Sequence, residues 1–195
     1  MKHIGILIFD GVEELDAVGP WEVLAWWSLE FPEDGYRVSF VSSTGDTVLA
    51  AKGLTLTPHS SLDDAAPFDV FLHPGGHGTR RLMADPDHLD RMRQLAAITP
   101  LMTSVCTGSL VYAAAGLLRG RPATTYWGSL SVLADLDPTI ELRPDDRWVD
   151  DGDVITSAGV SAGIDMSLHL VRRLAGVDRA RQVKRGIQYD PQPPV

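Results

Sequence analysis

Apolar segments of strand length alternate along this chain with segments that have the composition of helices. The predicted strands are 2–9, 36–42, 47–51, 54–57, 69–73, 100–105, 122–126, 140–142, 147–149 and 154–156. The predicted helices are 19–27, 85–98, 109–115, 129–136 and 161–174, followed by a last helix that Asp178 caps. This alternation predicts βαβ units and therefore a mostly parallel sheet with helices on both faces. Ligands of such folds bind at the carboxyl ends of the strands.

Composition narrows the class of protein further. The chain has 195 residues, of which 44% are hydrophobic and 22% charged, as expected for one domain spanning 1–195. Its net charge is −9 and no basic cluster exceeds Arg80-Arg81 or Arg172-Arg173, so we expect neither nucleic acid nor a membrane as partner. A single cysteine excludes an internal disulfide, and a free thiol suits a reducing compartment, which predicts a cytoplasmic location.

That cysteine, Cys106, lies where a short apolar run changes into the Ala-rich helical segment 109–115, which Gly116 ends. A strand that turns directly into a helix forms a sharp elbow, and Gly108 allows close packing there. The amide groups at a helix N-terminus favour an anion, so the position predicts a thiol pKa below its ordinary value of about 8.5. The alternative is a buried structural cysteine. The elbow favours a nucleophile.

A glycine-rich segment follows the predicted strand 69–73. The amides of Gly75 and Gly76, with that of Thr107, are candidates for an oxyanion hole, because glycine lets a backbone approach a ligand closely. His77 is a candidate for the wall of the same cleft. An ordinary glycine-rich turn is the alternative interpretation.

Asp16 is the candidate acid or base. It follows Leu15 and precedes Ala17-Val18, so it is expected to be half-buried, with a pKa raised by desolvation and by a neighbouring thiolate. An N-cap of the next helix is the alternative role. No spacing of His, Cys, Asp or Glu resembles a metal site, and no loop matches a nucleotide-binding pattern, so no metal or organic cofactor is predicted.

These segments together resemble the ThiJ/PfpI superfamily, whose domain is similar to class I glutamine amidotransferases. The runs that carry the resemblance are Leu15-Asp16 before Gly19-Pro20, Pro74-Gly75-Gly76, Ser104-Val105-Cys106-Thr107-Gly108-Ser109, Ala123-Thr124-Thr125 and Ser161-Ala162-Gly163-Ile164-Asp165. Within the superfamily the chain is most similar to the isocyanide (isonitrile) hydratases and to the amidase-like domains of AraC-type regulators.

The resemblance implies a flavodoxin-like three-layer sandwich, usually a homodimer, with a cysteine nucleophile at an elbow. The nucleophile of the hydratases corresponds to Cys106, its carboxylate partner to Asp16, and the residue after the nucleophile to Thr107. Proteolytic relatives have histidine at that last position, which argues against a peptidase. Tyr126 stands where the hydratase pattern has histidine, and we assign it with Gly75, Gly76 and His77 to substrate or oxyanion binding.

Three functions follow from these expectations. The first is a lyase that hydrates an isocyanide, a small-molecule substrate, to an N-substituted formamide. The second is a ligand-binding or redox-sensing module without turnover. Glyoxalase or deglycase chemistry comes third, since those relatives have Glu where this chain has Asp16. The apolar first helix with Trp26 and Trp27 adds to the expectation of a homodimer.

Overall fold

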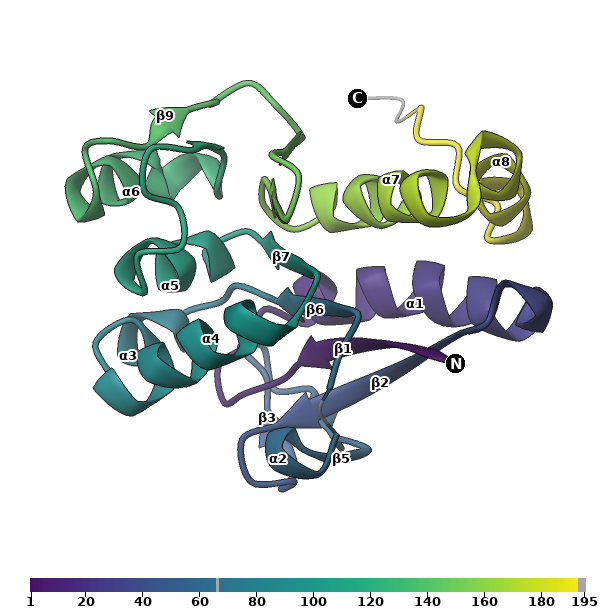
Figure 1. Ribbon diagram of the computed structural model, residues 1–195, viewed down its shortest axis with the longest axis horizontal. Helices are drawn as coiled ribbons and strands as arrows, with labels where there is room; N and C mark the ends of the chain where they lie inside the picture. The colour runs from purple at the N-terminus through teal and green to yellow at the C-terminus, as the bar shows by residue number, and fades with distance from the viewer. Residues whose placement is uncertain (66, 193–195) are drawn as a thin grey trace.

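The computed structural model describes residues 1–65 and 67–192 of the chain. Within these residues, seven strands form one sheet in the order β10-β11-β7-β6-β1-β2-β5 (Figure 1). Their bounds are β1 Lys2–Leu7, β2 Tyr36–Ser42, β5 Ser60–Ser61, β6 Val70–His73, β7 Leu101–Val105, β10 Trp148–Asp150 and β11 Val154–Ser157. All neighbouring strands are parallel except β10 and β11. The predicted mostly parallel sheet is confirmed.

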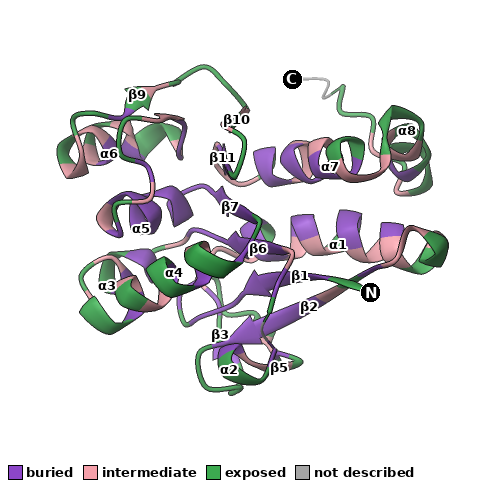
Figure 2. Cartoon of the chain, in the orientation of Figure 1, coloured by how far each residue is buried: buried purple, intermediate pink, exposed green. Residues whose placement is uncertain are grey.

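Helices cover both faces of this sheet, as the sandwich requires (Figure 1). On one face lie α1 Glu14–Glu30, α7 Ala162–Ala175 and α8 Val177–Gly186. On the other face lie α4 Pro86–Ile98 and α5 Gly108–Ala114. The remaining helical elements are the shorter helices α2 Leu62–Ala65, α3 Thr79–Leu82 and α6 Leu130–Leu136 and two 3-10 turns at Pro32–Asp34 and Trp127–Ser129. The central strands and the inner helix faces are buried, and the apolar side chains between them form one continuous core (Figure 2).

Two small sheets complete the described structure. The predicted hairpin is present as β3 Val48–Leu49 paired antiparallel with β4 Thr55–Leu56. The predicted strand 122–126 is shorter than expected: β8 Pro122–Ala123 pairs with β9 Glu141–Leu142, and the amide of Thr124 already donates to the Thr156 hydroxyl at 2.9 Å. The strand therefore ends at Ala123, because the next amide bonds to a side chain and not to a neighbouring strand.

The first helix differs from its prediction. It begins at Glu14 rather than at Gly19, so Pro20 lies inside it rather than in its first turn. Proline has no N–H, so the Asp16 carbonyl loses its usual helical partner. Packing offsets this loss, because Pro20 is buried and a Cβ on Gly163 of α7 would lie 3.3 Å from its ring. The last helix also differs, since Gly176 precedes it and Asp178 lies in its first turn instead of capping it.

The tryptophans of α1 pack within the chain. Trp27 is fully buried and its indole N–H donates to Asp34 at 2.7 Å. The ring of Trp26 lies against Gly186 of α8, where an added Cβ would meet it at 2.0 Å. Trp27 is therefore not available at the surface, whereas Trp26 is half-buried beside α8. Dimerisation stays a prediction that rests on the family resemblance.

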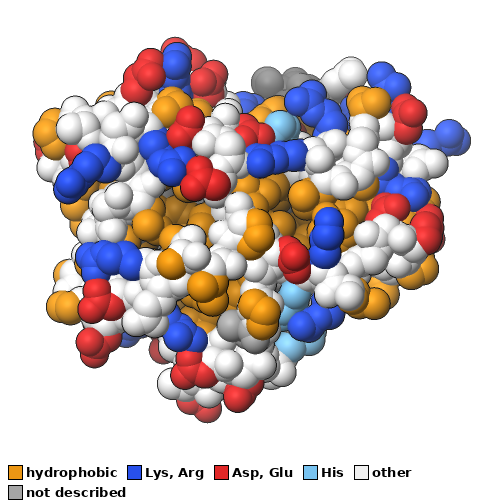
Figure 3. All heavy atoms as spheres, in the orientation of Figure 1, with side chains coloured by type: hydrophobic (Ala, Val, Ile, Leu, Met, Phe, Trp, Pro, Cys, Tyr) orange, Lys and Arg blue, Asp and Glu red, His pale blue; other side chains and the backbone are white. Residues whose placement is uncertain are grey.

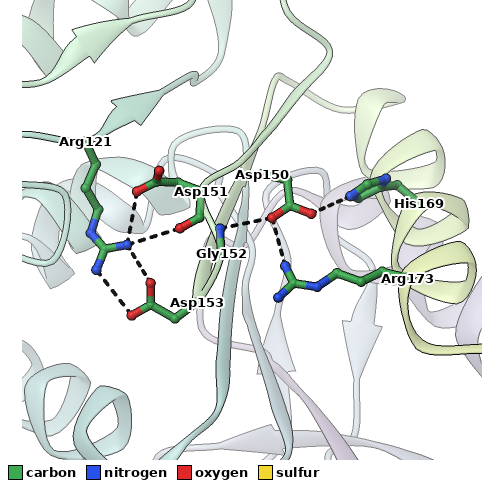
Figure 4. Close-up of polar contacts among 7 residues, drawn as sticks. All are labelled: Arg121, Asp150, Asp151, Gly152, Asp153, His169 and Arg173. Carbon is green, nitrogen blue, oxygen red and sulfur yellow. Dashed lines mark hydrogen bonds and ion pairs between the residues drawn. The ribbon is translucent and has the colours of Figure 1, made fainter.

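A network of charged residues fixes the β10–β11 turn (Figure 4). Asp150 accepts hydrogen bonds from His169 at 2.7 Å and from Arg173 at 2.8 Å, both on α7. Arg121 donates to Asp151 at 3.1 Å and to Asp153 at 2.6 Å. The antiparallel edge of the sheet is thereby tied to α7 and to the segment before β8.

Charges on the visible face are mixed, with Lys and Arg interspersed among Asp and Glu around apolar side chains (Figure 3). None of the helices in the described part of the chain is long and apolar enough to cross a membrane.

Candidate active site

Cys106 lies in the elbow between β7 and α5, as predicted. Its φ of 57° is in the left-handed region, which L side chains rarely adopt. Its amide donates to the Ser157 carbonyl at 3.0 Å, and its carbonyl accepts from the Thr125 hydroxyl at 2.9 Å and the Ser109 hydroxyl at 3.0 Å. A Cβ on Gly108 would lie 2.1 Å from the His73 carbonyl oxygen, so only glycine fits there. The surrounding strands therefore hold Cys106 in a strained backbone conformation.

Asp16 lies in the first turn of α1 and is fully buried. Its Oδ2 accepts a hydrogen bond from the Gly75 amide at 3.0 Å. Its Oδ1 is buried and has no hydrogen-bond partner among the described residues, while the Cys106 thiol lies beside the carboxyl. Glu13, not Asp16, is the N-cap residue of α1, so the capping interpretation is wrong. The carboxyl is available for proton transfer with the thiol.

The two groups have shifted pKa values. Burial raises the pKa of Asp16 from 3.8 to about 7, against the lowering effects of the Cys106 thiol and the Gly75 amide. Burial, and then the charge of Asp16, raise the pKa of Cys106 from 9.0 to about 12, although the amides of Thr107 and Val160 favour the thiolate. The sequence prediction of a lowered thiol pKa is therefore wrong: loss of water outweighs the helix terminus. The resting cysteine is a thiol, and Asp16 is the group placed to take its proton.

Two of the three predicted oxyanion amides, those of Gly75 and Gly76, have protein acceptors, whereas the amide of Thr107 faces the Cys106 thiol. The Gly75 amide donates to Asp16, and the Gly76 amide donates to the Thr107 hydroxyl at 3.0 Å. The Thr107 hydroxyl also lies 3.0 Å from that of Thr79. A Cβ on Gly75 would lie 2.5 Å from the Thr107 amide nitrogen and 2.8 Å from Asp16 Oδ2. These glycines therefore position Asp16 and Thr107 through close backbone contact, which occupies the two glycine amides assigned to an oxyanion.

A cavity of about 570 Å³ opens above the thiol. Its lining consists of Glu13, Lys52, Gly76, His77, Arg80, Cys106, Thr107, Tyr126, Gly128, Ser129 and Val160. His77 and Tyr126 thus lie where the sequence expected them, and Asp16 and Gly75 lie behind the lining. Of the two groups, Cys106 lines this cavity and Asp16 does not.

Several residues that line this cavity were not predicted from the sequence. Val160 has a φ of 53°, strained for a β-branched residue, and its amide faces the thiol and Asp16. Glu13 forms an ion pair with Lys52. Arg80 lies at the start of the short helix α3. Because Val160 follows strand β11, the rule that ligands bind at the carboxyl ends of strands could have identified it.

Across residues 1–65 and 67–192, no group of three or more His, Cys, Asp or Glu side chains could hold a metal ion.

A strained cysteine at a strand-to-helix elbow, above a parallel sheet and beside a buried carboxyl, defines an α/β protein with a cysteine-centred site. The chain belongs to the DJ-1/PfpI family, whose pattern matches residues 2–173. It is 43% identical to the isonitrile hydratase of Pseudomonas putida over 193 residues, which is 98% of this chain and 80% of that protein.

Two further comparisons agree with this family. The structure of a ThiJ/PfpI family protein from Pseudomonas syringae superposes with a TM-score of 0.86 at 32% identity, over 100% of this chain and 77% of that one. The HTH-type transcriptional regulator GbdR of Pseudomonas aeruginosa is 28% identical over 97% of this chain and 51% of the regulator. The chain therefore corresponds to about half of that regulator.

Proposed function

We propose that this protein is an isocyanide hydratase, which converts an isocyanide and water to an N-substituted formamide. The observation that carries the proposal is the buried pair of Cys106 thiol and Asp16 carboxyl beneath the cavity, with the neighbouring glycine amides already bonded. Acyl transfer needs free donors for an oxyanion, and the amides of Gly75 and Gly76 are not free. Addition to an isocyanide places no charge on oxygen; it needs a nucleophile and a proton delivered to one carbon. Similarity to the isonitrile hydratase of Pseudomonas putida supports the same reaction.

In the first step Asp16 takes the thiol proton while the Cys106 sulfur forms a bond to the terminal carbon. The carbon receives that proton from Asp16, which leaves a thioimidate, R–N=CH–S–Cys. Water then adds to this carbon as the nitrogen is protonated. Finally the C–S bond breaks, the sulfur regains a proton, and R–NH–CHO leaves. Every atom comes from the isocyanide, the cysteine and one water, so no cofactor is needed.

The test is to incubate the protein with n-butyl isocyanide and measure formamide by NMR. Cys106→Ser and Cys106→Ala should both lack activity. Because Asp16 must be ionised to accept the thiol proton, the rate should fall as the pH drops through about 7, the raised pKa of this carboxyl. A wild-type protein that forms no formamide from any simple isocyanide would contradict the proposal.

A ligand-binding module without turnover is the second candidate, and similarity to about half of the regulator GbdR favours it. It would bind a small molecule in the same cavity without consuming it. Mass balance separates the two: a hydratase releases product, and a sensor returns the ligand unchanged. For either role we propose a homodimer in a reducing, cytoplasmic compartment, where the lone thiol stays free.

A further inference from the structure

Arg80 is the cation in the cavity that has no acidic partner. Lys52, the other basic residue of the lining, is paired with Glu13 and Glu14. Among the described residues Arg80 forms no ion pair, although Asp and Glu outnumber Lys and Arg by 26 to 17 in this chain. Arg80 is therefore the cation of this lining that has no carboxylate contact among the described residues.

The guanidinium is held across the cavity wall by neutral groups. One of its terminal nitrogens donates to the Thr79 hydroxyl and the other to the buried Ser129 hydroxyl, both at 3.3 Å. Ser129 belongs to the 3-10 turn beside Tyr126, so Arg80 bridges two sides of the cavity. Arginine has about five N–H donors, and these two long contacts leave donors for a ligand. A planar fork of this kind matches the two oxygens of a carboxylate.

We propose that Arg80 binds a carboxylate of the substrate, so that the substrate class is an isocyanide whose R group carries a carboxylic acid. This inference rests on the proposed hydration reaction, which accounts for the isocyanide end of the substrate. It adds how the protein recognises the carboxylate end. The isocyanide carbon lies at Cys106 and the carboxylate at Arg80, both of which line the same cavity of about 570 Å³. That volume is ample for a small acid.

The first experiment compares isocyanoacetate with its neutral methyl ester as substrates. Wild type should prefer the acid in kcat/KM, and Arg80→Met should lower the ratio of acid to ester by about twofold to fivefold, the value of an exposed charge contact. Arg80→Lys keeps the charge without the fork and should give an intermediate ratio. Arg81→Met is the matched control, because Arg81 is exposed and lies outside this cavity; it should keep the wild-type ratio.

A second experiment does not depend on turnover. Iodoacetate and iodoacetamide differ by one charge, and both alkylate the sulfur with loss of iodide. Cys106 is the single cysteine of the chain, so mass spectrometry reports its modification alone. The rate ratio of iodoacetate to iodoacetamide should fall about fivefold in Arg80→Met and stay constant in Arg81→Met.

The outcomes separate the two proposals. Hydration of both substrates with a ratio unaffected by Arg80→Met would overturn the carboxylate assignment and leave the hydratase intact. If neither substrate is hydrated, the hydratase proposal fails. The alkylation ratio then decides whether Arg80 binds an anion: an unchanged ratio refutes that role as well. Thermal unfolding of each variant verifies that the fold is retained.

Discussion

Replacing Asp16 by Asn should make the protein more stable at alkaline pH and inactive at the same time. Burial raises the pKa of this carboxyl from 3.8 in the unfolded chain to about 7 in the folded one. A raised pKa means that the folded state holds the proton more tightly. Asp16 therefore contributes stability that is fully present below about 4 and is lost as the pH rises through about 7.

The magnitude follows from the size of the shift. Each pKa unit corresponds to about 1.4 kcal/mol, so the ionised Asp16 costs the folded state about 4 kcal/mol at about pH 8. Between about pH 5 and pH 8 the stability of the wild type should fall by about 3 kcal/mol from this group alone. Asn has no charge to desolvate, and its carbonyl oxygen can still accept the Gly75 amide. Asp16→Asn should lack this pH dependence.

Urea unfolding, followed by tryptophan fluorescence at both pH values, measures the difference. Glu22→Gln is the matched control, because Glu22 lies on the same helix but is exposed. Hydration by Asp16→Asn should fall by about 10²- to 10⁴-fold, the usual contribution of a general acid–base group. The same change in unfolding free energy with pH in Asp16→Asn and the wild type would refute the raised pKa of Asp16. Hydration by the variant at the wild-type rate would refute its role in proton transfer.

Three further predictions concern the network around this pair and the assembly. Thr107→Val leaves the Gly76 amide without its acceptor and should cost about 1–3 kcal/mol of unfolding free energy in urea titration, whereas Thr107→Ser should match the wild type. Gly75→Ala places a methyl group against Thr107 and Asp16, so it should lower the free energy of unfolding by about 1–3 kcal/mol and abolish hydration. Normal activity of this variant would show that the backbone has room for the methyl group. Light scattering should give twice the 21.2 kDa of one chain, and a single-chain mass would exclude the homodimer.

Local features of this fold could be predicted from the sequence because neighbouring residues determine them. The helix predicted at 85–98 is present as α4, and Asp85 caps it by accepting from the amides of Asp87 and His88. The strand-to-helix elbow at Cys106 follows from an apolar run, a small residue and a helical segment in immediate succession. The start of α1 could not be predicted in this way, because packing on α7 offsets the cost of an interior Pro20.

The α/β class, the order of most elements and the position of Cys106 at an elbow could be predicted from the residues alone, since periodicity and turn residues act over a few positions. The chemical state of the site depends instead on contacts between distant parts of the chain. Asp16 bonds to Gly75, which is 59 residues away, and Arg80 bonds to Ser129, 49 residues away. A pKa depends on burial and on nearby charges, which distant segments supply. The reversal of the expected Cys106 pKa has this cause: the helix terminus is local, but the loss of water around the sulfur comes from the whole fold.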